Sequence, residues 1–292
     1  MGQSSREIKR RIASITSTQQ ITKAMEMVAV AKLRKAQETV VSTRPYFDRL
    51  SNSLAIVLDA AEKSGETLPE IAQTRSGNRH CLLVFTSDRG LAGGYNSSMI
   101  RQAEAFLRER PDTDMVIVGR KARDHFRRRN QTFLAEFVHL GDDPTLAQAQ
   151  DISRVIFDFY EHGLFDRVTI LYTEFINTVT HQVVLRDVLP IVPEELPEDN
   201  LSTGPTPLYL FEPSVNAVLE TLIPLYLQAA VYRSLVEAKA SELGARMNAM
   251  RNATDNAGEL IEELNLTYNR ARQAQITKEI AEIVGGADAL QS

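Results

Sequence analysis

The segment LGARMNAMRNATDNAGELIEELNLTYNRA (243–271) carries the pattern that decides the fold. One set of positions recurs at alternating steps of four and three residues: Leu243, Met247, Met250, Thr254, Ala257, Ile261, Leu264, Tyr268 and Ala271. A repeat of about 3.5 residues is typical of a helix that packs along another helix. Pro213 suits the first position of this helix. We therefore expect it to run to about Gly285, roughly 110 Å at ~1.5 Å per residue.

The N-terminal end carries a similar pattern. Ser4 and Glu7 form a capping-box signature for the start of a helix. One face of this helix forms the seam that would pack against a partner helix. It contains the polar residues Gln19 and Thr22 among the apolar and small residues Ile8, Ile12, Ile15, Met25, Ala29, Leu33, Ala36 and Val40. Polar seam residues of this kind more commonly set helix register than bind a ligand. The pattern resumes beyond Pro45, which predicts a kink there and a helix that continues to about residue 58, roughly 80 Å.

The two ends of the chain carry opposite charge. Residues 1–50 hold ten Lys or Arg against four Asp or Glu, whereas Pro213–Ser292 hold seven against ten. Neither helix fits inside a compact globule at the expected length. Two long helices of opposite charge most simply pair with each other in antiparallel orientation.

Two prolines offer a register for this helix pair. If Pro45 and Pro224 lie level, Ile15 faces Thr254 and both seams mesh. The chain beyond about residue 266 then has no N-terminal partner, although it still carries the apolar residues Ile276, Ile280, Ile283 and Val284. An apolar stripe without a partner predicts that another protein encloses it.

Between the long helices the pattern changes to short β-rich runs. These runs are LLVFT (82–86), MVIVG (115–119), TFLAEFV (132–138), VTILYTEF (168–175) and THQVVLRDVL (180–189). Helical stretches separate the first four runs near 97–110, 120–129 and 145–162, and this alternation predicts a mostly parallel sheet. The last two runs predict an antiparallel hairpin at the edge of the sheet.

The sequence therefore predicts an α/β fold in which a long antiparallel coiled coil of N- and C-terminal helices joins a central Rossmann-like α/β domain. We expect the N-terminal coiled-coil helix at 1–62, the central domain at 78–207 and the C-terminal coiled-coil helix at 208–292. A loop rich in proline and acidic residues (190–207) leaves the central domain.

Composition disfavours several classes of protein. The 292 residues are 43% hydrophobic and 24% charged, which is the balance of a soluble globular protein. The single Cys81 excludes a disulfide framework. No apolar run approaches the ~18 residues of a membrane span, and the start MGQSSREIKRR fits neither a secretory signal nor an N-myristoylation site. Because the basic residues lack interleaved aromatics, we expect no nucleic-acid partner.

No motif predicts a catalytic, metal or cofactor site. None of the five histidines lies three or four residues from another, as metal ligands often do. The loop SDRGLAGGYN (87–96) lacks both the GxGxxG order and a GK[ST] sequence, so it predicts a tight turn with Asn96 or Ser97 capping the next helix. Two other interpretations stay open, namely a free-standing coiled-coil scaffold and a nucleotide-dependent α/β enzyme with helical arms.

Four segments resemble the γ subunit of F-type ATP synthases, and the resemblance covers the whole chain. IKRRIASITSTQQITKAMEMVAVAKLRKAQ (8–37) is similar to the first helix of that family. ITKEIAEIVGGADA (276–289) is similar to its C-terminal signature, with matches at Thr277, Glu279, Glu282, Gly286, Ala287 and Ala289. TSDRGLAGGYN (86–96) and YLFEPS (209–214) fit its internal landmarks.

The resemblance implies a central-stalk rotor that turns inside a ring of α and β subunits. It couples ion flow through the membrane c-ring to the catalytic β subunits, and it is itself non-catalytic and holds no cofactor. The implied β-subunit contacts are Lys23, Met25, Glu26, Arg272, Gln273 and Thr277. The implied apolar bearing is formed by Ile276, Ile280, Ile283 and Val284. The implied foot places Tyr209 toward the ε subunit and Phe211 and Glu212 toward the c-ring.

The sequence also departs from relatives in this family. Many of them have cysteine where Ala92 stands, and the dithiol insertion of the chloroplast type is absent, so we expect no thiol control of that kind. The chain shows no transit peptide, which favours a bacterial origin or a mature form. The expected location is the cytoplasmic face of the bacterial cell membrane, as a peripheral protein.

Overall fold

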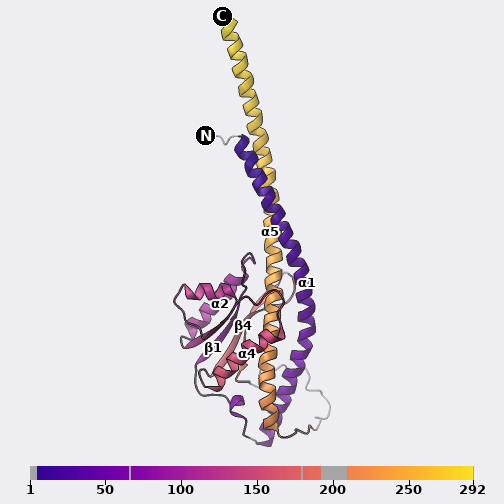
Figure 1. The fold of residues 1–292 in the computed structure, drawn as a ribbon, viewed down its shortest axis with the longest axis vertical. Helices are drawn as coiled ribbons and strands as arrows, with labels where there is room; N and C mark the ends of the chain where they lie inside the picture. The colour runs from indigo at the N-terminus through magenta and orange to yellow at the C-terminus, as the bar shows by residue number, and fades with distance from the viewer. Residues whose placement is uncertain (1–4, 66, 179, 192–208, 292) are drawn as a thin grey trace. The chain divides into compact units, whose positions relative to one another are not determined.

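The computed structural model describes residues 5–65, 67–178, 180–191 and 209–291 (Figure 1). Its elements are α1 (Ser5–Ser64), a 3-10 turn η1 (Glu70–Ala72), β1 (His80–Phe85), α2 (Tyr95–Glu109), β2 (Thr113–Val118), α3 (Arg120–Arg127), β3 (Ala135–Phe137), α4 (Leu146–Glu161), β4 (Arg167–Phe175), β5 (His181–Leu189) and α5 (Val215–Gln291). The chain divides into two compact units, Met1–Ala29 with Met247–Ser292, and Val30–Arg246. Both long helices, α1 and α5, contribute to both units.

The unit Val30–Arg246 is built on a five-stranded sheet with the strand order β3-β2-β1-β4-β5. Strands β1 to β4 run parallel to one another, and β5 pairs antiparallel with β4 at the sheet edge. The predicted sheet and edge hairpin are therefore confirmed. The third strand is shorter than predicted, because only Ala135–Phe137 of the run 132–138 pairs with β2.

Alternate residues of β1 enter two different hydrophobic cores. Leu82 and Val84 lie in the core that α2 and α3 form on one face of the sheet. Cys81, Leu83 and Phe85 lie in the core formed by α4, α1 and α5 on the other face. A strand buried on both faces must be apolar at every position, which explains why the run is continuous instead of alternating.

The unit of Met1–Ala29 and Met247–Ser292 is an antiparallel helix pair, and α1 and α5 lie side by side there (Figure 1). The Thr254 hydroxyl donates to the Thr22 hydroxyl at 2.9 Å, and Arg251 lies 3.2 Å from Glu26. The predicted pairing of Ile15 with Thr254 is wrong by one heptad. Heptad seams mesh equally well after a shift of seven residues, so apolar spacing could not choose between the two registers.

Polar seam residues account for the observed register. Besides the pair of threonine hydroxyls, Gln19 Nε2 lies 3.4 Å from the carbonyl oxygen of Thr254. A Cβ atom at Gly258 would lie 3.2 Å from the same Gln19 nitrogen, so the glycine gives the amide room. The N-terminal helix also covers α5 further than the predicted limit near residue 266. Ala271 is still partly buried, whereas every side chain from Arg272 to Val284 is exposed.

The long helices differ from the predictions at their ends. α1 continues through Pro45 to Ser64, so the prediction that this proline would not end the helix is confirmed. α5 begins at Val215 instead of Pro213 and extends past Gly285. The capping box predicted at Ser4 lies outside the described residues. The division at 1–62, 78–207 and 208–292 stays a prediction, since the compact units follow other boundaries.

The α5 helix contains an unexpectedly apolar stretch. Within Val215–Val284, one 18-residue window has a mean hydropathy of 1.2, so by length and composition alone it could cross a membrane. The prediction that no run comes near this limit was therefore too strict. Leu219, Ile223 and Leu227 of this helix are fully buried in the core against the sheet. Packing inside the protein is the simpler explanation of that apolar composition.

Candidate partner-binding surfaces

The first candidate surface lies on α1 around Glu26. This carboxylate is 6% exposed, and it lies 3.0 Å from Lys23 Nζ and 3.2 Å from Arg251 Nε. The hydrogen bond from Lys23, and then that from Arg251, lowers the pKa of Glu26 against the opposing effect of burial. Of the three residues expected here, Met25 is partly buried, Glu26 is paired inside the helix pair, and Lys23 keeps a side chain that is 56% exposed.

Three apolar side chains on the outside of α1 were missed by the sequence analysis. Ile21, Met27 and Val28 are each more than half exposed, although they belong to the helix-pair unit. The available signal was the segment ITKAMEMVAVA (21–31), which is apolar well beyond one seam. A helix that is apolar nearly all round is buried on more sides than one partner helix can cover.

The second candidate surface is the part of α5 beyond Ala271. Arg272, Gln273 and Thr277 are exposed, and the Thr277 hydroxyl donates to the backbone oxygen of Gln273 at 2.9 Å. The predicted apolar stripe is exposed at every position: Ile276 44%, Ile280 56%, Ile283 71% and Val284 54%. Exposed isoleucines in a row are costly in water, at about 25 cal/mol per Å² of apolar surface. The structure therefore leaves this stripe available to another protein.

The third candidate surface precedes α5. Tyr209 is 49% exposed, and its ring stacks on that of Phe211 with 6.3 Å between the ring centroids. Phe211 is partly buried against the core that includes α5, which fixes the base of this segment. Glu212 is exposed. An aromatic pair and a carboxylate are thus presented together, next to the helix start.

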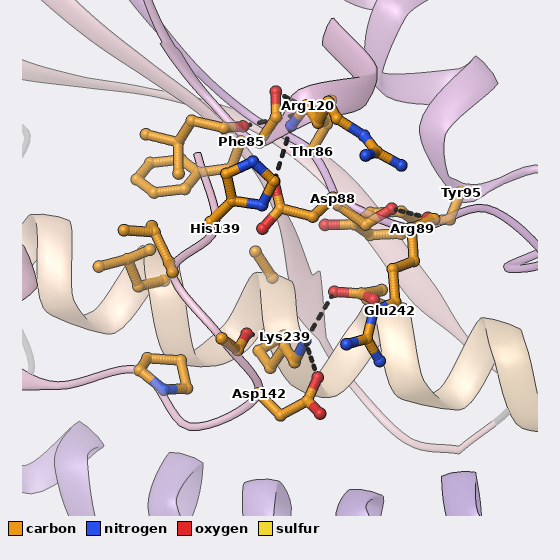
Figure 2. A pocket seen from close by; sticks show the side chains of 18 residues that line it. Phe85, Thr86, Asp88, Arg89, Tyr95, Arg120, His139, Asp142, Lys239 and Glu242 are labelled. Carbon is orange, nitrogen blue, oxygen red and sulfur yellow. Dashed lines mark hydrogen bonds and ion pairs between the residues drawn. The ribbon is translucent and has the colours of Figure 1, made fainter. Parts of the chain in front are cut away.

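A cavity of about 270 Å³ lies beside the carboxyl ends of β1 and β2 (Figure 2). Ligands of open α/β sheets commonly bind at this edge. Asp88 Oδ1, however, accepts the backbone N–H of Arg120 at 2.9 Å and so occupies the start of α3. Lys239, on the opposite wall, is paired with both Glu242 and Asp142. A phosphate would have to displace these carboxylates, so the geometry does not favour the nucleotide-enzyme interpretation.

The loop 87–96 is held differently from the prediction. Asn96 lies inside α2 and accepts from the backbone N–H of Ser87 at 3.0 Å, and the helix begins after Gly94 without a side-chain cap. The expected cap at Asn96 or Ser97 is therefore wrong. The side chain of Asn96 instead binds Ser87 at the other end of the same loop. Among the described residues, no group of three or more His, Cys, Asp or Glu could hold a metal ion.

Comparisons with known proteins bear on this arrangement. The family described as ATP synthase matches residues 4–290. The chain is 49% identical to the ATP synthase gamma chain of Heliobacterium modesticaldum over 98% of each chain. It is 48% identical to the gamma chain of Moorella thermoacetica over 98% of this chain and 99% of the relative.

Solved structures show the same fold. A chain of the central stalk and c-ring of the Tetrahymena thermophila mitochondrial ATP synthase is 26% identical with a TM-score of 0.62, over 80% of this chain and 99% of that one. A chain of the Euglena gracilis mitochondrial ATP synthase is 20% identical with a TM-score of 0.68, over 98% of this chain and 94% of that one. Two long terminal helices that pair and carry an α/β sheet define the central-stalk class of protein. Within that class, the chain belongs to the ATP synthase γ chain family.

Proposed function

We propose that this chain is the rotor of an ATP synthase, a non-catalytic γ subunit that couples ion flow through a membrane c-ring to the catalytic β subunits. The observation that carries the proposal is the exposed apolar stripe on α5 beyond Ala271, at a point where α1 no longer covers the helix. A solvent-exposed helix gains nothing from isoleucines there. A sleeve formed by other subunits would bury them.

The rotor acts by contacting the β subunits unequally. A part that holds no nucleotide shifts a nucleotide-binding equilibrium only through different contacts with the different states of each site. In this proposal Lys23, Met25 and Glu26 contact β at one level of the stalk. At a second level the contacts come from Arg272, Gln273 and Thr277. Because the surface of the helix pair at the first level and that of α5 alone at the second are both asymmetric, every β subunit meets a different surface.

The remaining surfaces hold the rotor at its two ends. Ile276, Ile280, Ile283 and Val284 form the apolar bearing inside the α and β ring. Tyr209 contacts the ε subunit, and Phe211 and Glu212 contact the c-ring. The chain thereby stays on the cytoplasmic face of the bacterial membrane as a peripheral protein, without crossing the membrane itself. These assignments follow the family resemblance and agree with the exposure of Tyr209 and Glu212.

Thiol labelling tests the sleeve directly. Cys81 is fully buried, so it leaves the chain without a reactive thiol. Ile276→Cys should react readily with a maleimide in the purified full-length chain. It should react about tenfold more slowly or less once purified α and β subunits are added, because the sleeve excludes the reagent.

A control variant separates burial from general effects of assembly. Gln102→Cys, on the exposed side of α2, should react at the same rate with and without α and β. Equal protection at both positions would indicate nonspecific association. Unchanged labelling of Ile276→Cys in a complex that contains all three chains would rule out the proposed bearing.

A further inference from the structure

The loop between β3 and α4 contacts both long helices. We call residues 139–144 the strap. Its backbone is constrained at His139 and Gly141, whose φ angles are +62° and +83°. The strap is also anchored to α4, because Gln148 Nε2 donates to the Leu140 oxygen at 2.8 Å and Thr145 forms a capping box with Gln148. A loop held at its ends in this way presents its middle residues in one place.

Asp142, in the middle of the strap, bridges the two helices with one carboxylate. Its Oδ2 atom accepts from Lys32 of α1, and its Oδ1 atom accepts from Lys239 of α5 at 3.1 Å. Figure 2 shows the ion pair of Lys239 with Asp142. Lys239 also lies 3.3 Å from the Gly141 oxygen. The neighbouring Asp143 lies 2.8 Å from Lys35 of α1. All of these residues belong to the unit Val30–Arg246.

The strap contacts lie at a level of α1 that the apolar core around the sheet does not reach, although Leu33 of α1 is itself buried there. Among described residues, the buried side chains that α1 gives to the core around the sheet begin at Phe47 and continue toward Ala61. Lys32 and Lys35 are about three to four helical turns earlier. At that level the ion pairs of Asp142 with Lys32 and of Asp143 with Lys35 link the sheet domain to α1.

We propose that the strap is a coupling element, in which Asp142 ties Lys32 of α1 and Lys239 of α5 to the sheet at once, so that sheet and helices move together. The inference concerns contacts within this chain and does not rest on the proposed function. The links are unequal. Lys239 and Glu242 are nearly buried, at 11% and 8% side-chain exposure, whereas Lys35 and Asp143 are about two-thirds exposed and contribute little.

The strap remains charged at neutral pH. Lys32 and then Lys239 hold the pKa of Asp142 well below its ordinary range, against the opposing effect of burial. Other charged groups around the site are Lys35, Asp143, Glu242 and Arg246, and the last two are paired at 2.7 Å. The ion pairs of Asp142 with Lys32 and Lys239 therefore persist at neutral pH. Removing the Asp142 charge or either lysine would break them.

Hydrogen exchange on the full-length chain tests the proposal. Asp142→Asn keeps the shape of the side chain but removes its charge. We expect amide exchange in 139–144 to accelerate about fivefold or more, with a smaller acceleration in 30–36 and none in β1. The reason is that a strap released from Lys32 and Lys239 opens locally more often. Asp143→Asn is the matched control and should change exchange less than about twofold, since its ion pair is exposed.

Two further variants test the bridge itself. Lys32→Met and Lys239→Met should each accelerate exchange in the strap, and neither should add to the effect of Asp142→Asn in the double variant. Lys32 is partly exposed, so its variant is expected to fold even if the Asp142 variant does not. Equal exchange in the Asp142 and Asp143 variants would overturn the proposal. An effect of Lys239→Met without any effect of Lys32→Met would show a strap tied to α5 alone, and would also overturn it.

Discussion

At the scale of single residues, Gly119 shows how closely the backbone is packed at the sheet edge. It lies between β2 and α3 with φ +98°, and a Cβ atom there would lie 2.0 Å from the backbone oxygen of Thr86. The N–H of Gly119 donates to the Phe137 oxygen at 2.8 Å, so the position cannot shift without losing a contact with the end of β3. Glycine is needed here for both conformation and space.

Gly119→Ala should therefore destabilise the protein strongly. We expect a loss of about 3 kcal/mol or more in the free energy of unfolding by urea, because strain and a backbone clash combine. Gly163→Ala is the control. That glycine also has positive φ, at +68°, but nothing lies within 4 Å of its missing Cβ, so the cost should be only about 1 kcal/mol. Equal losses in the two variants would contradict the account of the clash.

Buried charge matters at a second residue, Glu237 of α5. It is 1% exposed and lies 3.2 Å from Arg44 Nε and 3.0 Å from Arg233 Nε, and it accepts from the backbone N–H of Phe175 at 3.3 Å. Glu237→Gln would remove the nearest and most buried counter-charge of Arg233, which keeps Asp48 at 3.3 Å and Glu174 at 3.5 Å. The expected loss is about 2 kcal/mol in chemical denaturation. The exposed Glu220→Gln on the same helix should cost less than ~0.5 kcal/mol, and a similar cost for both would contradict the network.

The ion pair between the buried Asp166 and the half-exposed Arg79 predicts a pH effect. Arg79 hydrogen bonds lower the pKa of Asp166 below its ordinary 3.8, against the opposing effect of burial. A carboxylate with a lowered pKa stabilises the fold above the unfolded-state pKa and loses this contribution as pH falls through the folded-state pKa. As pH falls below about 4, wild type should thus lose stability more steeply than Asp166→Asn. Parallel stability curves for the two proteins would refute this assignment.

At the scale of elements, the two long helices raise the question of register. The apolar spacing of each helix predicts a pair, and the pair is present. The spacing alone does not choose between registers one heptad apart. Thr22, Gln19, Thr254 and Gly258 make the choice through hydrogen bonds and available space. Polar residues in a seam cost stability and restrict the partner, which is their usual role in coiled coils.

Disulfide formation tests this register. Thr22→Cys with Thr254→Cys should oxidise rapidly, because the two hydroxyl oxygens they replace lie 2.9 Å apart. Ile15→Cys with Thr254→Cys should oxidise slowly, since the second pair is about 10 Å further apart along the helix axis. Efficient oxidation of the Ile15 pair and not of the Thr22 pair would restore the register expected from level prolines.

The sequence predicted the elements better than the contacts between them. The continuous apolar runs of β1 and β4 were recognisable because both faces of these strands are covered. The pairs Asn96 with Ser87 and Asp142 with Lys32 were not predictable, because such polar contacts depend on how loops fold back. The exposed apolar face at Ile21, Met27 and Val28 could have been predicted, because these residues are apolar and lie outside the heptad positions of α1.

Across the whole molecule, several apolar surfaces of the described residues are not covered by the chain itself. The stripe at Ile276–Val284, the outer face of α1 and the aromatic pair before α5 are exposed in a chain whose sheet domain has well-buried cores. Such a division between covered and uncovered apolar surface is expected of a subunit and not of an independent protein. In the proposed function, these surfaces contact other subunits of an ATP synthase.

Single-molecule rotation tests whether this chain turns inside the ring of α and β subunits. A probe would be attached through Gln102→Cys, an exposed position on α2, in a complex of this chain with α and β subunits held on a surface. With ATP supplied, the account predicts unidirectional rotation of the probe that stops when ATP is removed. A complex that hydrolyses ATP at its normal rate while the probe remains stationary would contradict the rotor function.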